Sequence, residues 1–90
     1  MALVKFTPNL KRFFPDLCEI EVEGRTVAEL VAAVDARWEG LADYIIDERG
    51  ALRKHVNIFI GEDLINDKQN LSDVVGQNTR VYIMQALSGG

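Results

Sequence analysis

The chain has 90 residues, of which 48% are hydrophobic and 27% are charged, and this is the composition of a single ordinary globular domain. Its net charge of −4 argues against nucleic-acid binding, which requires a basic surface. The single cysteine excludes an internal disulfide, no apolar run is long enough to span a membrane, and the N-terminus lacks the layout of a signal peptide. We therefore expect a cytoplasmic protein with no nucleic-acid or membrane partner.

Two strands are predicted in the first quarter of the chain. Residues 2–7 form the first, and residues 17–23 form the second with the clearest alternation, because Cys18, Ile20 and Val22 face one way and three glutamates face the other. This pattern is typical of a half-buried antiparallel strand, with Cys18 as a small core residue. The connection between the strands carries apolar side chains that require cover, so we expect it to pack back on the fold: Leu10, Phe13 and Phe14.

The main helix is predicted to begin after Thr26. Thr26 can cap the free amides, and Glu29 three residues later completes a capping box. Apolar residues then recur at helical spacing as far as Gly40, which suits a left-handed cap: Val27, Leu30, Val31, Val34, Trp38 and Leu41. Trp38 on this stripe is expected in the core. A second short helix over residues 41–47 is expected to bury Tyr44 or Ile45.

The second half of the chain predicts two strands and a shorter third. Residues 56–60 form a strand with Asn57 and Phe59 facing outward, and a turn at 61–63 leads to a brief strand at 64–65. Residues 71–75 are predicted to form one turn of helix, packed by Leu71, Val74 and Val75. Gly76-Gln77-Asn78 makes the last turn. Residues 79–86 form the final strand, which is expected to lie beside the first.

This order of elements predicts an α+β domain with a mixed sheet of four to five strands and one main helix across one face. The β-grasp (ubiquitin-like) fold satisfies that plan. We assign residues 1–86 to the domain and residues 87–90 to a flexible tail.

The tail, Leu87-Ser88-Gly89-Gly90, is the first candidate functional segment. Glycine has no Cβ, so Gly89 and Gly90 fit a slot too narrow for other residues. A terminal carboxylate on Gly90 is ionised at neutral pH and can act as an oxygen nucleophile. Two terminal glycines also arise by chance or as a linker remnant, so the rest of the chain must decide between these interpretations.

The chain resembles the ubiquitin-like sulfur carriers, namely the small subunit of molybdopterin synthase, the thiamin sulfur carrier and the cysteine-biosynthesis sulfur carrier. The resemblance rests on the helix from Thr26, on residues 56–60 with the acidic turn after them, and on residues 76–90. Leu52-Arg53-Lys54-His55 before this strand is most similar to the cysteine branch. The turn at 76–78 lacks the aspartates usual in the family, and residues 85–88 lack its proline and valine, so all three pathways stay open.

The resemblance implies a carrier that is a cosubstrate and not an enzyme. An activating adenylyltransferase would use ATP and Mg²⁺ to adenylate Gly90, and a sulfurtransferase or other sulfur donor would convert it to a thiocarboxylate. A sulfur-accepting synthase would then take the sulfur. Gly89 would keep the tail thin, Leu87 and Ser88 would extend it, and the chain itself would bind no cofactor or metal.

Two other functions remain open, a protein modifier joined to lysines through Gly90 and a β-grasp interaction domain whose glycines are incidental. A docking surface is predicted at Phe59 and Leu64, on the sheet face away from the helix; alternatively Phe59 packs beneath the loop at residues 10–14. The remaining polar candidates are assigned to loops, turns or solvated surface: Arg53, Lys54, His55, Glu62 and Asp63.

Overall fold

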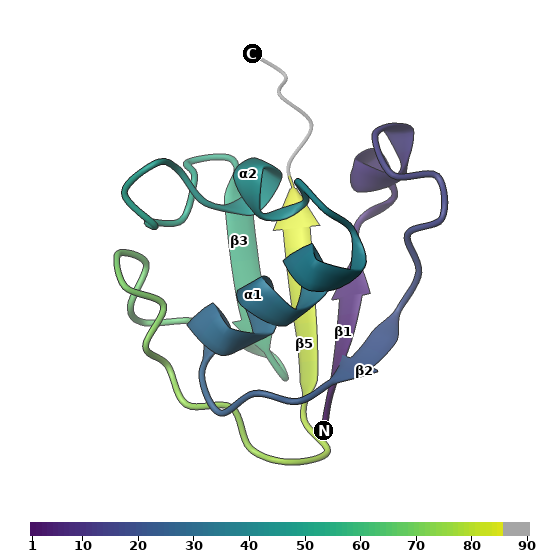
Figure 1. Ribbon diagram of the computed structural model, residues 1–90. Helices are drawn as coiled ribbons and strands as arrows, with labels where there is room; N and C mark the ends of the chain where they lie inside the picture. Colours follow the sequence, from purple (N-terminus) through teal and green to yellow (C-terminus); the bar gives the residue numbers. More distant parts are fainter. Residues whose placement is uncertain (86–90) are drawn as a thin grey trace.

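The computed structural model describes residues 1–85, with Asn9 as backbone only, and shows a five-stranded mixed sheet with one main helix across one face (Figure 1). The sheet order is β2-β1-β5-β3-β4. The strands are β1 (Ala2–Phe6), β2 (Ile20–Val22), β3 (Val56–Ile60), β4 (Asp63–Leu64) and β5 (Arg80–Gln85). The predicted α+β plan is confirmed, and the tail assigned to residues 87–90 lies outside the described residues.

The first and last strands form the centre of the sheet, as predicted. β1 and β5 run parallel with Val4 opposite Val81, and all other strand pairs are antiparallel. On the β3 side, Ile58 lies opposite Ile83. These residues are buried because successive side chains of a strand alternate between faces, and one face lies against the helix.

The second strand is shorter than predicted, and the prediction for Cys18 is wrong. β2 pairs with β1 only from Ile20 to Val22, so Cys18 lies before the ladder and is exposed. The alternation itself holds over the paired residues, where Ile20 and Val22 pack partly against the core. The buried residue of this segment is Leu17, which precedes the strand.

Helix α1 (Val27–Arg37) begins at the predicted cap. The Thr26 hydroxyl accepts the Glu29 N–H at 3.3 Å, while Oε1 of Glu29 accepts the N–H of Arg25 at 3.1 Å. Trp38 follows the helix and meets Phe6 edge-on with 5.8 Å between ring centroids, so it packs against the predicted core but is itself only half-buried. After Gly40 (φ +95°) a short second helix, α2 (Ala42–Ile45), buries Ile45 completely.

The connection between β1 and β2 folds back as expected, with one exception. It contains a 3-10 helix, η1 (Pro8–Arg12), and buries Leu10. Phe14 is half-buried, whereas Phe13 remains 52% exposed although one face of its ring stacks on Tyr44 of α2. These aromatic rings therefore cover α2 and leave Phe59, on the other face of the sheet, uncovered by this loop.

The predicted helical turn at residues 71–75 does not form. Leu71 has a left-handed backbone conformation (φ +53°), and Val74 forms an antiparallel bridge with Thr26 while its side chain is 77% exposed. The first amides of α1 explain the extended conformation, because Val27 donates to the carbonyl of Asp73 and Ala28 to that of Leu71. Helix termini leave such amides unpaired, and this segment satisfies two of them.

Candidate functional site: the end of strand β5 and the open face of the sheet

The end of β5 is held from both sides. In the neighbouring strand β3, Val56 lies opposite Gln85. On the other side the hydroxyl of Thr7 accepts the Gln85 N–H at 3.1 Å, and the Thr7 N–H donates to the carbonyl of Ile83 at 3.2 Å. Thr7 is buried, so these bonds are shielded from water. Residue 85, from which the candidate tail would depart, is therefore fixed to the sheet.

Nothing in the sequence marks Thr7 as a positioning residue. It was only the last residue of a predicted strand, and nothing local distinguishes it from other threonines. Its role depends on the parallel pairing of β1 with β5, because its partner Gln85 lies 78 residues further along the chain. The one available signal is that Thr7 is a polar residue at the end of a strand whose alternate residues are apolar.

The predicted tail residues Leu87, Ser88, Gly89 and Gly90 lie outside the described residues. Their reach follows from chain geometry alone. Five residues beyond Gln85 span at most about 16–18 Å when extended. A carboxylate on Gly90 would thus lie within that distance of the end of β5.

The predicted docking residues Phe59 and Leu64 are brought together by the structure. They lie opposite each other in the β3–β4 pair, on the sheet face away from α1. Tyr82 lies opposite Phe59 on the β5 side, and Lys5 lies opposite Tyr82, so one row of side chains crosses four strands. Leu64 is 46% exposed, and both aromatic residues are half-buried. This row is a partly apolar surface that the helices leave open.

The polar candidates from sequence analysis do not assemble a catalytic or metal site. Within residues 1–85 no group of three or more His, Cys, Asp and Glu side chains is close enough to hold a metal ion. His55 is exposed beside Lys54, Glu62 is exposed in the β3–β4 turn, and Asp63 is exposed at the start of β4. In the same part of the chain, no helix is long and apolar enough to cross a membrane.

Two carboxylates with shifted pKa values lie in loops. The Ser72 hydroxyl and three backbone N–H groups donate to Asp67 and lower its pKa from 3.8 to about 2. The backbone N–H groups of Arg49 and Ala51 lower the pKa of Asp47. Hydrogen bonds to the charged form cause both shifts, so these groups hold loops in place.

The sequence from Lys5 onward decides the family. A family model described as the ThiS family matches residues 5–90. The chain belongs to the ThiS family. It is 22% identical over 73 residues to the sulfur carrier protein CysO of Mycobacterium tuberculosis, an alignment that covers 79% of this chain and 78% of CysO. The resemblance to the ubiquitin-like sulfur carriers is thereby confirmed.

Solved structures agree with this ThiS-family chain in fold. The crystal structure of the Amycolatopsis orientalis BexX/CysO complex matches with a TM-score of 0.85 at 20% identity and covers 100% of both chains. The small archaeal modifier protein 1 (SAMP1) of Methanosarcina acetivorans matches with a TM-score of 0.77 at 22% identity, covering 99% of this chain and 95% of that one. The predicted β-grasp fold is confirmed.

Proposed function

We propose that this ThiS-family chain is a sulfur carrier whose Gly90 carboxylate is converted to a thiocarboxylate. The observation that carries the proposal is the anchoring of Gln85 by Thr7 and β3, because it holds the start of a Gly-Gly tail at a fixed place on the domain. The family membership and the similarity to CysO support it. The similarity to CysO favours a cysteine-type pathway over the molybdopterin and thiamin types.

The chemistry begins with the weak electrophilicity of a carboxylate. A Gly90 carboxylate oxygen attacks the α-phosphorus of ATP, the bond to the β-phosphate bridging oxygen breaks, and pyrophosphate leaves. Hydrosulfide then attacks the carbonyl carbon of this mixed anhydride, the bond to AMP breaks and a proton is released. A persulfide donor would give an acyl disulfide, which a thiol then cleaves to the same thiocarboxylate.

The chain is a cosubstrate in this proposal, and its partners supply the catalysis. An activating adenylyltransferase binds ATP and Mg²⁺, a sulfurtransferase or other donor provides sulfur, and a synthase accepts it. Gly89 and Gly90 keep the tail thin enough to enter the active sites of these enzymes. The domain stays outside these active sites and positions the tail.

Docking on these partners is assigned to the open sheet face, centred on Phe59 and Leu64. The row of residues from Leu64 to Tyr82 joins an exposed aliphatic side chain to two half-buried aromatic rings. Aromatic residues of this kind often dominate binding energy at protein interfaces. The open sheet face also includes β5, the strand from which the tail departs. A partner bound to this face would therefore be close to the tail.

A second function, modification of lysines through Gly90, is favoured by the similarity to SAMP1, whose name describes a modifier. It would begin with the same adenylate, but a lysine amine would take the place of sulfur as the nucleophile. The two functions therefore differ in the product and not in the activation.

Mass spectrometry of the intact protein, together with that of tryptic peptides from the proteins of its own cells, tests both. A sulfur carrier that ends at Gly90 is expected to show a fraction about 16 Da heavier, since sulfur replaces oxygen in the carboxylate. A modifier is expected to leave a remnant that ends in Gly90 on target lysines, and after trypsin, which cleaves behind Arg80, this remnant is residues 81–90. A chain found only with further residues after Gly90, or with neither product, would contradict both functions and leave an interaction domain.

A further inference from the structure

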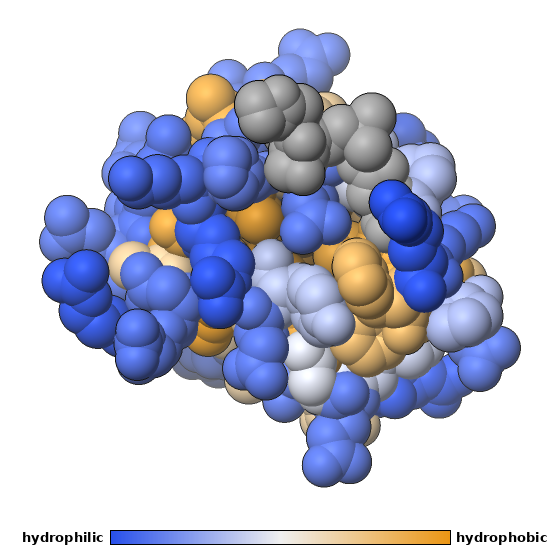
Figure 2. Space-filling view, turned by 90° about the horizontal axis from the view of Figure 1, so that it is seen from above, coloured by the Kyte–Doolittle hydropathy of each residue, from blue (hydrophilic) through white to orange (hydrophobic). Residues whose placement is uncertain are grey.

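A second open surface lies at the same end of the molecule, on the helix side of the sheet. Phe13 stacks on Tyr44 with ring centroids 4.7 Å apart and 24° between the ring planes, and Phe14 meets Tyr44 edge-on at 5.5 Å. We call these three rings the aromatic plate. Figure 2 looks onto this end of the molecule and shows apolar surface between hydrophilic side chains.

The exposure of Phe13, the outer ring of the aromatic plate, is not explained by packing of the fold. Phe13 leaves 52% of its surface in water, although full burial of such a side chain is worth about 1.5–3 kcal/mol. Its stacking on Tyr44 fixes the ring in place, so the exposed face is preorganised. A rigid exposed aromatic ring is well suited to bind a partner at low entropic cost.

Cations lie beside the aromatic plate. Lys11 and Arg12 immediately precede Phe13 in the last turn of η1, and both are exposed. Neither pairs with a carboxylate of residues 1–85, where the one ion pair joins Lys5 to Glu19 at 3.7 Å.

A third cation lies beside α2, the helix that carries Tyr44. Nε of Arg53 donates to the carbonyl oxygen of Asp43 at 2.7 Å, which holds this guanidinium against α2, the helix of Tyr44. Two exposed carboxylates lie on the same segments, Asp16 in the loop and Asp43 in α2, so the three cations outnumber them by one.

We propose that the aromatic plate, together with Lys11 and Arg12, docks on the activating adenylyltransferase, against a patch with an apolar centre and an acidic rim. The inference rests on the proposed function. An enzyme that receives the tail must approach within about 16–18 Å of Gln85, the end where the plate lies. Because the chain has a net charge of −4, an acidic rim would repel most of its surface. The same rim would attract the site formed by Lys11 and Arg12, which favours this orientation.

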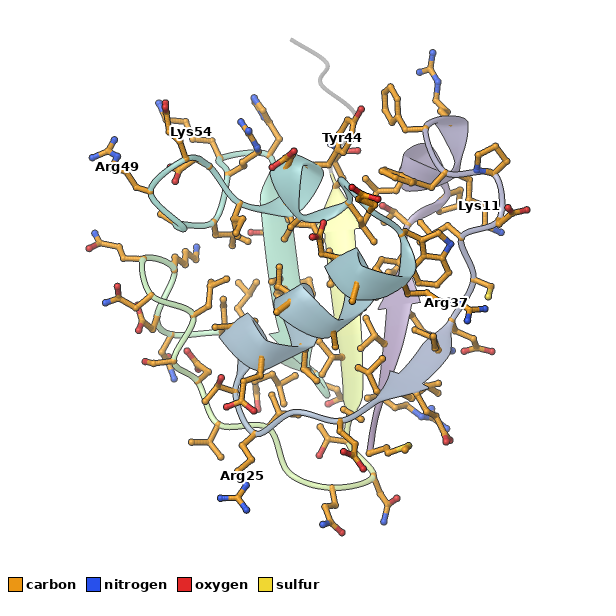
Figure 3. All side chains as sticks on the ribbon, in the orientation of Figure 1. Lys11, Arg25, Arg37, Tyr44, Arg49 and Lys54 are labelled. Atoms are coloured by element: carbon orange, nitrogen blue, oxygen red, sulfur yellow. The ribbon has the colours of Figure 1, made fainter. Side chains whose placement is uncertain are left out.

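The plate and the sheet face lie on opposite sides of β5, so the enzyme would hold the tail between two contacts. Figure 3 shows Lys11 and Tyr44 at this end of the molecule and Arg25 at the opposite end. This arrangement supplies matched controls. Arg25 is an exposed arginine, and Val74 is an exposed apolar residue, both near the start of α1 and far from the plate.

ATP–pyrophosphate exchange, catalysed by the adenylyltransferase of the same organism at varied carrier concentration, tests the proposal. Phe13→Ala is expected to raise the KM for the carrier about tenfold, and Arg12→Glu by roughly three- to tenfold at low salt. The kcat should stay unchanged because the reacting carboxylate is untouched. The effect of Arg12→Glu should fade in about 0.5 M salt. The controls Val74→Ala and Arg25→Glu should match the wild type.

Folding of each variant is checked by its thermal unfolding midpoint. A KM within twofold of the wild-type value for folded Phe13→Ala and Arg12→Glu would overturn the inference and leave the proposed function intact. Equal effects of the controls would overturn it as well. A wild-type carrier that supports no exchange would overturn the proposed function, and this inference with it.

Discussion

Phe59 and Leu64 lie directly opposite each other in the antiparallel pair of β3 and β4, on the face of the sheet away from α1. The ring of Phe59 is half-buried, whereas Leu64 is 46% exposed. Because Leu64 contributes little to the core, it can be changed to test docking without unfolding the domain.

Leu64→Glu is expected to raise the KM of the carrier for its activating enzyme about tenfold, because a carboxylate would be buried in an apolar contact. The free energy of unfolding should change by less than about 0.5 kcal/mol, as for other surface substitutions. Glu62→Gln, at the adjacent turn, is the matched control and should leave the KM unchanged. Folded Leu64→Glu and Phe59→Ala proteins that are activated at the wild-type rate would contradict docking at this face.

The centre of the core should be the most sensitive part of the fold. Ile83 is fully buried in β5, opposite Ile58. Ile83→Val is expected to lower the free energy of unfolding by about 0.5–1.5 kcal/mol, and Ile83→Ala by about 2–5 kcal/mol, because each removes buried methyl groups and leaves a cavity. Urea denaturation measures both. Val74→Ala, at a 77% exposed position, should change little, and an equal loss there would contradict this assignment of the core.

Gly24 packs too closely on α1 to accept a side chain. A Cβ on Gly24 would lie 2.8 Å from Cδ2 of Leu30 and 3.3 Å from its backbone nitrogen. Gly24→Ala should therefore lower the free energy of unfolding by about 1–3 kcal/mol, as is typical of overpacking. Gly76→Ala is the control, since its Cβ would meet only the Thr79 hydroxyl at 3.3 Å, and thermal unfolding should show a smaller loss for it.

Acid should loosen the loop around Asp67. Its pKa of about 2 in the folded protein lies below the 3.8 of a free carboxyl, so it contributes stability that is fully present above about pH 4. This contribution is lost as the pH falls toward about 2. Asp67→Asn should be less stable than wild type at pH 7, and its stability should fall less steeply between about pH 4 and pH 2.

Urea midpoints measured across this range check the prediction for Asp67. Asp47 also has a lowered pKa, so part of the acid response should remain in Asp67→Asn. If the urea midpoints of wild type and Asp67→Asn fell in parallel with pH, Asp67 would contribute nothing to the acid response. Ser72→Ala, which removes the hydroxyl that lowers the Asp67 pKa most, should move the profile in the same direction as Asp67→Asn.

The sequence was sufficient where the local pattern and the long-range contacts agree. The strand at residues 56–60 is predicted with its bounds, because β-branched residues recur at every second position (Val56, Ile58 and Ile60) and the run ends at Gly61. Thr26 marked the start of α1 for a local reason as well, since cap and first turn lie within four residues. For the same reason the outward position of Phe59 could be read from its neighbours.

Predictions failed where distant backbone decides the local conformation. The apolar spacing of residues 71–75 favours a helical turn, yet their carbonyls pair with the first amides of α1 and hold the segment extended. Cys18 has the alternation of a strand, but the β1–β2 ladder stops at Val4 opposite Ile20, so it lies outside the sheet. Thr7 is the same case at the candidate site, because its partner Gln85 is distant in the chain.

The parallel pairing of β1 with β5 has a consequence for biosynthesis. The two adjacent strands in the middle of the sheet come from opposite ends of the described chain. Val4 can therefore pair with Val81 only after nearly all of the described chain has emerged from the ribosome. A nascent or prematurely terminated polypeptide has no β5 and cannot complete this sheet. Translation must therefore run to the last strand before any partner can recognise a finished domain.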